Sequence, residues 1–350
     1  MSTYLSLLNT QTKTQFIIFT GYKTIVYIQI YQYIMFKSYQ KRYPKLAAIE
    51  TVSFTQVMTK HLFGKDITLY SSNPMIVEYE EGYLLHLRWI NYSYHPDGTK
   101  KEWPELVVNL NSRCKLDKHF NQISEEEFLH EEEIIPSWGS FGQEDIRLFK
   151  HNDVYYYTAT SHDVDRQVVT VTSGRYPMET FELPIQPILP SFYEEKRHEK
   201  NWAFVEYQNK LTLVYAWYPL QLTEIDYESR QLNRVTTKVM PEFFKDARGS
   251  TSGYKKGNEI WFVVHKRRAF FKNKMHCLEY HHGIVIFDVE MNLLRYSEWF
   301  TLGNSAVEFC LGLIVTDTEV ILSYSLLDTQ SFVSVYNSSS LRRLKWYLSQ

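Results

Sequence analysis

The sequence predicts an all-β fold, a five-bladed β-propeller, from three observations. Aromatic residues, which favour strands, are abundant, with 27 Tyr, 21 Phe and 8 Trp among 350 residues. Helical patterns are scarce, and residues 124–131 are the best candidate for a short helix or an acidic surface loop. Strand-like runs rich in Val, Ile, Tyr, Phe and Trp recur at five places, each after a polar turn. The runs are residues 82–89, 154–159, 211–217, 259–265 and 319–325.

The spacing of these runs indicates radial repetition. They start roughly 50 to 70 residues apart, which is the period of a four-stranded propeller blade. Each run begins at a turn and ends in a polar or charged residue, which an inner strand can deliver to a central channel. We therefore expect the propeller to extend over residues 55–345.

Residues 1–50 are expected to form a poorly defined N-terminal extension. Within them, residues 16–36 are mostly apolar and about as long as a membrane-spanning helix. Lys23, Gln29 and Gln32 interrupt the stretch, and charged groups in a bilayer are costly. No stable membrane span is therefore expected, although anchoring through residues 16–36 stays open as an alternative. No small-residue cleavage site follows, so we expect no signal peptide.

Composition narrows the possible partners and cofactors. The chain is 44% hydrophobic and 22% charged with a formal net charge of −2, so it is globular and no nucleic-acid partner is expected. Its three cysteines, Cys114, Cys277 and Cys310, have neither CxxC nor zinc-site spacing. This usage is typical of a reducing compartment and predicts a cytoplasmic protein. No nucleotide-binding glycine loop is present, and we expect no metal and no cofactor.

Candidate functional residues lie near the same point of each strand-rich unit. In Glu144-Asp145-Ile146-Arg147, a regular strand would place the two carboxylates on opposite faces and Asp145 beside Arg147. The other candidates are Asn73, Arg88, Asn91, Lys200, Arg248, His265 and Asp328. Taken singly, each motif fits a structural salt bridge, turn or histidine better than a site. Their recurrence in all five units instead predicts one central pocket of acidic and basic residues.

In this order the motifs resemble glycoside hydrolase family 130 and the related β-1,2-mannosyltransferases. The resemblance covers about residues 70–330. Its most specific part is Glu144-Asp145-Ile146-Arg147, which looks like the family's Glu-Asp-Pro-Arg with Ile146 at the proline position. The family implies a five-bladed propeller whose members cleave or form β-mannosidic bonds with inversion.

The resemblance also implies roles for individual residues. Asp145 would be the general acid, acting through a sugar hydroxyl instead of directly on the glycosidic oxygen. The implied substrate-binding residues are Asn73, Arg88, Asn91, Glu144, Arg147 and Asp328. The implied phosphate-binding residues are Arg166, Lys200, Arg248 and His265.

The basic residues favour a phosphate-bearing reactant, because Arg, Lys and His neutralise phosphate. We therefore expect a glycosyltransferase or glycoside phosphorylase that makes or phosphorolyses β-mannoside-type bonds, with a glycan or a sugar phosphate as its substrate. Residues 199–202 and 248–251 resemble the transferases slightly more. Two alternatives stay open. One is a hydrolase on the same fold, which would need a second carboxylate to activate water, and the other is a non-catalytic propeller that binds glycan or protein.

Overall fold

The structure is a computed structural model in which residues 45–350 form one compact unit. It describes residues 43–101, 103–129, 140–163, 168–178, 187–192, 198–272, 274–303 and 305–349. The apolar stretch of residues 16–36 lies outside these ranges. Within them, no helix is both long enough and apolar enough to cross a membrane.

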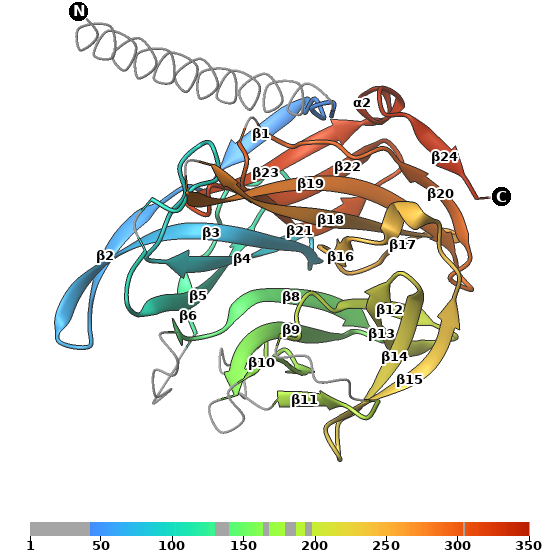
Figure 1. The fold of residues 1–350 in the computed structure, drawn as a ribbon, viewed down its shortest axis with the longest axis horizontal. Coiled ribbons are helices and arrows are strands. Elements are labelled where there is room, and N and C mark those ends of the chain that lie inside the picture. The colour runs from blue at the N-terminus through green and yellow to red at the C-terminus, as the bar shows by residue number, and fades with distance from the viewer. Residues whose placement is uncertain are drawn as a thin grey trace, which may run out of the picture. The chain divides into compact units, whose positions relative to one another are not determined.

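The described strands form four sheets (Figure 1). The eight-stranded sheet consists of two antiparallel units joined by the parallel pair β11–β15. We count these two units separately and number the resulting units as blades 1 to 5 in chain order. Blade 1 contains β2 (Val57–Leu62), β3 (Lys65–Tyr79), β4 (Gly82–Ile90), β5 (Val107–Leu116), β6 (Glu127–Phe128) and β7 (Ser140–Phe141). Blade 2 contains β8 (Glu144–His151), β9 (Val154–Asp163), β10 (Val168–Arg175) and β11 (Pro187–Pro190). Blade 3 contains β12 (Ala203–Tyr207), β13 (Lys210–Trp217), β14 (Leu220–Asp226) and β15 (Gln231–Lys238).

The last two blades complete the set. Blade 4 contains β16 (Ala247–Gly249), β17 (Tyr254–Lys256), β18 (Glu259–Lys272), β19 (Met275–Asp288), β20 (Leu293–Ser297) and β24 (Trp346–Leu348). Blade 5 contains β21 (Glu308–Val315), β22 (Glu319–Leu326), β23 (Gln330–Asn337) and β1 (Glu50–Ser53). A 3-10 helix, η1 (Glu242–Phe244), precedes blade 4, and a short helix, α2 (Ser338–Arg342), follows β23.

Contacts between neighbouring blades close these units into a ring. β3 contacts β8, β8 contacts β12, β13 contacts β16, β18 contacts β21, and β21 contacts β3 again. Blades 2 and 3 are also joined at the periphery, where β11 pairs in parallel with β15. This closed order is that of a β-propeller, and it agrees with the fold predicted from the five apolar runs.

The ring is closed with residues from before the expected start of the propeller at residue 55. Strand β1 pairs antiparallel with β23, from Glu50 opposite Val335 to Ser53 opposite Phe332. Leu46 is only 2% exposed and packs in a core cluster with Phe300. At the other end, β24 pairs with β20 beyond residue 345. The last residues of the segment expected as an N-terminal extension, residues 1–50, are therefore part of the ring.

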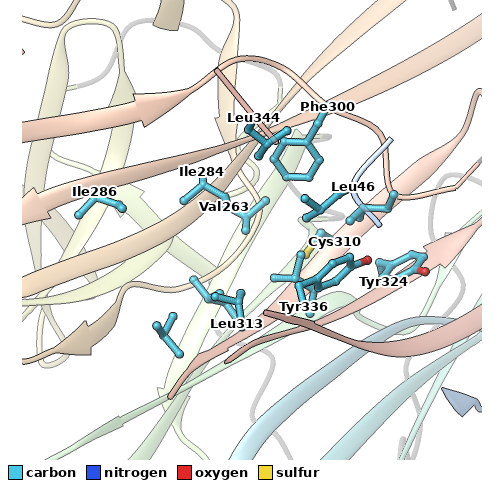
Figure 2. Packing of buried hydrophobic residues seen from close by; sticks show 14 residues of the cluster. Leu46, Val263, Ile284, Ile286, Phe300, Cys310, Leu313, Tyr324, Tyr336 and Leu344 are labelled. Atoms are coloured by element: carbon cyan, nitrogen blue, oxygen red, sulfur yellow. The ribbon is translucent and has the colours of Figure 1, made fainter. Parts of the chain in front are cut away.

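Apolar side chains hold neighbouring blades together. Figure 2 shows such a cluster, in which Val263 and Ile284 of blade 4 lie with Cys310 and Leu313 of blade 5. All three cysteines are buried and free, so they serve as small apolar side chains. The rigid packing fixes the inner strands, which carry the polar residues of the ring centre.

Bulges interrupt the inner strands where those polar residues lie. The register of β3 against β4 shifts between Ser72 and Met75, and that of β8 against β9 shifts between Glu144 and Arg147. β-bulges bend a strand and redirect its side chains. The alternation that we expected for residues 144–147 is therefore wrong, because the segment is not a regular strand.

Candidate active site

One large cavity lies at the centre of the ring, with a volume of about 880 Å³ and lining residues from all five blades. Eight of the side chains singled out in the sequence line it together. They are Asn73, Arg88, Glu144, Asp145, Lys200, Arg248, His265 and Asp328. Residues up to 255 positions apart in the chain, Asn73 and Asp328, thus share one pocket, as the sequence predicted. No cluster of potential metal ligands occurs among the described residues.

The carboxylate of Asp145 is fixed by hydrogen bonds to one of its two oxygens. Its Oδ1 accepts hydrogen bonds from Nδ2 of Asn73 at 2.7 Å and from Nη1 of Arg88 at 2.8 Å. No hydrogen bond joins Oδ2 to a described residue, so this oxygen is the one available to a ligand. Asp145 has a φ of 55°, a left-handed conformation that is uncommon outside glycine and often found at functional sites.

Asn73 and Arg88 are themselves fixed by neighbouring side chains. The side-chain oxygen of Asn73 accepts hydrogen bonds from the hydroxyls of Ser72 and Ser325, which turns its amide nitrogen toward Asp145. The Nε and Nη2 of Arg88 donate to Oδ1 of Asn109 at 2.8 and 2.5 Å. Arg88 is 3% exposed. Little of its side chain is open to a substrate, and its guanidinium orients the Asp145 carboxylate.

Glu144 and Lys200 form an ion pair beside Asp145. The Nζ of Lys200 lies 3.3 Å from Oε2 of Glu144, and Nη2 of Arg88 lies 3.8 Å from Oε1. Burial opposes ionisation of Glu144, but the charges of Lys200 and Arg88 outweigh it and hold the pKa of this carboxyl at about 2. Glu144 is therefore a fixed anion, and its charge neutralises Lys200.

Asp328 contrasts with Glu144. Burial raises its pKa to about 6, with further help from the nearby charges of Asp145 and Glu144, while Arg88 opposes the shift. Two carboxyls of the cavity, Glu144 and Asp328, therefore have well-separated pKa values.

His265 enters the cavity as a neutral ring. Its Nδ1 lies 2.9 Å from Oγ of Ser250. Burial first, and then the neighbouring His282 and Arg248, lower its pKa well below the usual range. His265 can therefore offer a hydrogen bond to a phosphate, but it adds no positive charge.

Two sequence-derived site residues, Arg147 and Asn91, are not among the described residues that line the cavity. Arg147 is 1% exposed, and its guanidinium donates hydrogen bonds to Ser250, Asp145 and Asn201 within the protein. Asn91 makes structural hydrogen bonds, donating to the carbonyl of Leu106 at 2.9 Å and accepting from the amide of Val108 at 2.8 Å. Both side chains are thus used within the protein, and their assignment as substrate-binding stays a prediction. Arg166 lies outside the described residues.

The cavity also contains residues that the sequence reasoning missed. Arg267, Tyr280, His162 and Glu199 line it. Glu199 is anchored by hydrogen bonds from Tyr215 Oη at 2.8 Å and from Trp202 Nε1 at 3.3 Å. Strand alternation could have identified Arg267, because residues two apart on a strand share a face and Arg267 follows His265 at that spacing. Tyr280 carried no such signal, since it depends on the register of the β18–β19 hairpin.

No family model and no curated protein matches this sequence, but solved structures match most of the chain. A β-1,2-mannobiose phosphorylase from Listeria innocua, in complex with β-1,2-mannobiose, is 13% identical, with 79% of this chain and 92% of that chain covered and a TM-score of 0.52. A mannose phosphorylase from Leishmania mexicana, in complex with a phosphate ion, is 10% identical, with coverages of 80% and 87% and a TM-score of 0.52.

A third structure comes from the GH130 family of mannoside phosphorylases, which contains glycoside hydrolases that target β-1,2-mannosidic linkages in Candida mannan. It is 10% identical, with 85% of this chain and 94% of that chain covered and a TM-score of 0.55. At this level of identity the likeness establishes the fold. The chain therefore has the β-propeller fold of the GH130 mannoside phosphorylases and glycoside hydrolases.

Proposed function

We propose that this protein is a glycan-active enzyme that makes or phosphorolyses β-mannoside-type bonds with inversion, using a phosphate-bearing reactant. One observation carries the proposal: Asp145 of blade 2 shares a single cavity with three cationic side chains. They are Arg88 of blade 1, Lys200 of the segment leading into blade 3, and Arg248 of blade 4. Scattered surface positions would have favoured a non-catalytic propeller. The structural neighbours that bind β-1,2-mannobiose and phosphate support the same class of ligands.

Asp145 is the proposed general acid of this reaction. In phosphorolysis, a phosphate oxygen attacks the anomeric carbon on the face opposite the leaving oxygen. The bond to the leaving oxygen breaks, and this oxygen takes a proton that Asp145 supplies through a sugar hydroxyl. In the synthetic direction, Asp145 removes the same proton from the acceptor. Fixing Oδ1 with Asn73 and Arg88 leaves Oδ2 as the oxygen that exchanges the proton.

The other cavity residues divide into sugar and phosphate contacts. Asp328 and Glu144 present carboxylate oxygens that can bind sugar hydroxyls. Lys200, Arg248 and the neutral His265 can hold phosphate oxygens. Because Glu144 already neutralises Lys200, the phosphate-bearing reactant depends more on blade 4 than the sequence suggested.

The decisive experiment supplies one phosphate-bearing reactant at a time. Purified protein is incubated with mannose 1-phosphate, with a nucleotide-mannose, or with phosphate plus β-mannosides, and products and their anomeric configuration are followed by NMR. We expect an inverted product that forms only with a phosphate-bearing reactant and is lost in Asp145→Asn. Saturable glycan binding with no product in any mixture would instead identify a binding propeller.

A hydrolase is the second candidate, and the pKa values of two carboxyls favour it. Asp328 has a pKa of about 6 and Glu144 a pKa of about 2. Inverting hydrolases use one protonated carboxyl as acid and one carboxylate as base. Release of mannose from β-mannosides in phosphate-free buffer, with oxygen from isotope-labelled water in the product, would identify this activity.

A further inference from the structure

One wall of the cavity carries two arginines that are close in the fold but not in the sequence. Arg248 on β16 lies directly across from His265 on β18. Arg267 lies two residues further along β18, on the same face as His265, and Tyr280 on β19 is its cross-strand partner. All four side chains line the cavity.

Among the described residues, the two arginines differ from the nearby Lys200 in having no ion-pair partner. Neither Arg248 nor Arg267 makes an ion pair or a hydrogen bond with any residue in the part of the chain that the structure describes, and both are exposed to the cavity. Lys200, on another wall, is paired with Glu144 at 3.3 Å. The basic side chains on the opposite face of β18 are also engaged: Lys266 lies over the ring of Trp299, and Arg268 lies 3.7 Å from Glu279.

Two unpaired guanidinium groups on one wall repel each other. Burial and the charge of Arg267 both lower the pKa of Arg248, which shows that the two groups sense one another. An anion between them would remove this repulsion. Guanidinium groups suit phosphate in particular, because their planar fork of donors matches phosphate oxygens.

We propose that Arg248, Arg267 and Tyr280 form a phosphoryl-binding subsite on blade 4 that is separate from Lys200. The inference rests on the proposed function and deepens it, since it gives the phosphate-bearing reactant a position. Free phosphate, a sugar phosphate and a nucleoside diphosphate share this chemistry. The phosphoryl group contacts the two guanidinium groups and accepts a hydrogen bond from the Tyr280 hydroxyl.

The subsite adjoins the proposed acid. Burial raises the pKa of Tyr280 to about 12, the charges of Asp328 and Asp145 add to the shift, and Arg267 and Arg248 oppose it. Tyr280 therefore lies within electrostatic reach of both the carboxylates and the arginines. A phosphoryl group on the arginines is placed beside Asp145, where a sugar attached to it would meet the acid.

Binding without turnover tests the subsite. Inorganic phosphate, pyrophosphate and mannose 1-phosphate are titrated calorimetrically into wild type, Arg248→Gln, Arg267→Gln and Lys200→Gln. The matched control is Arg268→Gln, which removes the same charge from the next residue of β18 on the opposite face. We expect each of the two subsite variants to bind the phosphoryl probes about 10- to 100-fold more weakly, which is the effect of losing a charged hydrogen-bond donor. Arg268→Gln should retain binding within about threefold, and Lys200→Gln should lose less than either subsite variant, because Glu144 already neutralises Lys200.

The outcomes separate this inference from the proposed function. Unchanged binding in Arg267→Gln, an equal loss in Arg268→Gln, or no saturable binding of any probe to wild type overturns the subsite. Arginine-dependent binding without glycosyl transfer from any reactant retains the subsite and overturns the proposed function. The probe with the highest arginine-dependent affinity identifies the source of the phosphoryl group.

Discussion

Replacing Arg147 by methionine should destabilise the propeller, because this side chain ties several blades together. Its Nε donates to the carbonyl of Ser250 at 2.9 Å, its Nη1 to the carbonyl of Asp145 at 3.1 Å, and its Nη2 to Oδ1 of Asn201 at 3.0 Å. These partners lie in β8 of blade 2, in the segment leading into blade 3, and between β16 and β17 of blade 4. Its guanidinium carbon also lies 5.8 Å from the ring centre of Phe309 in blade 5.

The size of the effect follows from these contacts. Hydrogen bonds to charged groups contribute about 1.5–3 kcal/mol each, so three sum to roughly 5–9 kcal/mol. Burial disfavours the charged guanidinium of Arg147 and lowers its pKa, so removing that charge offsets part of the loss. The substitution leaves three neutral acceptors without this donor, at about 1–3 kcal/mol for each buried group left unsatisfied, so we expect a net loss of roughly 3–5 kcal/mol for Arg147→Met.

Urea denaturation followed by tryptophan fluorescence measures the change. Arg295→Met is the matched control, because Arg295 forms a bidentate pair with Glu259 at 2.6 and 2.9 Å but lies nearer the surface. That substitution should cost less than about 1 kcal/mol. A loss below about 1 kcal/mol in Arg147→Met, or equal losses in the two variants, would refute the role of Arg147 as a buried tie between blades.

Three further predictions concern catalysis and pH. Asp145→Asn should keep its fold by circular dichroism and lose roughly 100- to 10,000-fold in kcat; near-normal turnover would show that the acid is misplaced. Lys200→Ala should raise KM for the phosphate-bearing reactant in steady-state assays, but less than Arg248→Ala does, because Glu144 already neutralises Lys200; the reverse order would place the phosphate on Lys200. Burial raises the pKa of Glu308 from 4.5 to about 7 against three backbone N–H donors. Its contribution to stability is therefore full below about pH 4.5 and is lost as pH rises through 7, so the stability of wild type relative to Glu308→Gln should fall by about 3 kcal/mol over that range. A flat difference in denaturation curves from pH 4 to 8 would contradict it.

The fold was predictable because the signal repeats. Five apolar runs after polar turns need only local pattern and spacing, and each corresponds to a strand: β4, β9, β13, β18 and β22. Strand β1 could not be found in this way, because Glu50–Ser53 is short and mostly exposed. Its place depends on pairing with β23, nearly 280 residues later in the chain, which no local pattern encodes.

The sequence predicted which residues form the site better than it predicted how they are arranged and paired. Eight of the expected side chains share the cavity, because polar residues near the inner strands of a ring face the same central space. Sequence alone could not show which cations are already paired. Lys200 and Arg248 have equivalent positions in the sequence argument, yet Glu144 neutralises only Lys200. That distinction depends on contacts between blades 2 and 3.

Backbone conformation explains why regular alternation failed at Asp145. Asn73, Asp145, Asn201 and Asp328 all line the cavity and all have positive φ, between 42° and 63°. Asn and Asp tolerate this left-handed region better than other side-chain-bearing residues, but it still carries a cost. In β8 the left-handed residue coincides with the bulge, so Glu144 and Asp145 both reach the cavity although they are adjacent in sequence. The ring must stabilise these conformations, and it does so at Asp145 through the bond from Arg147 to the Asp145 carbonyl. The same side chain that ties the blades together therefore also holds the proposed acid in position.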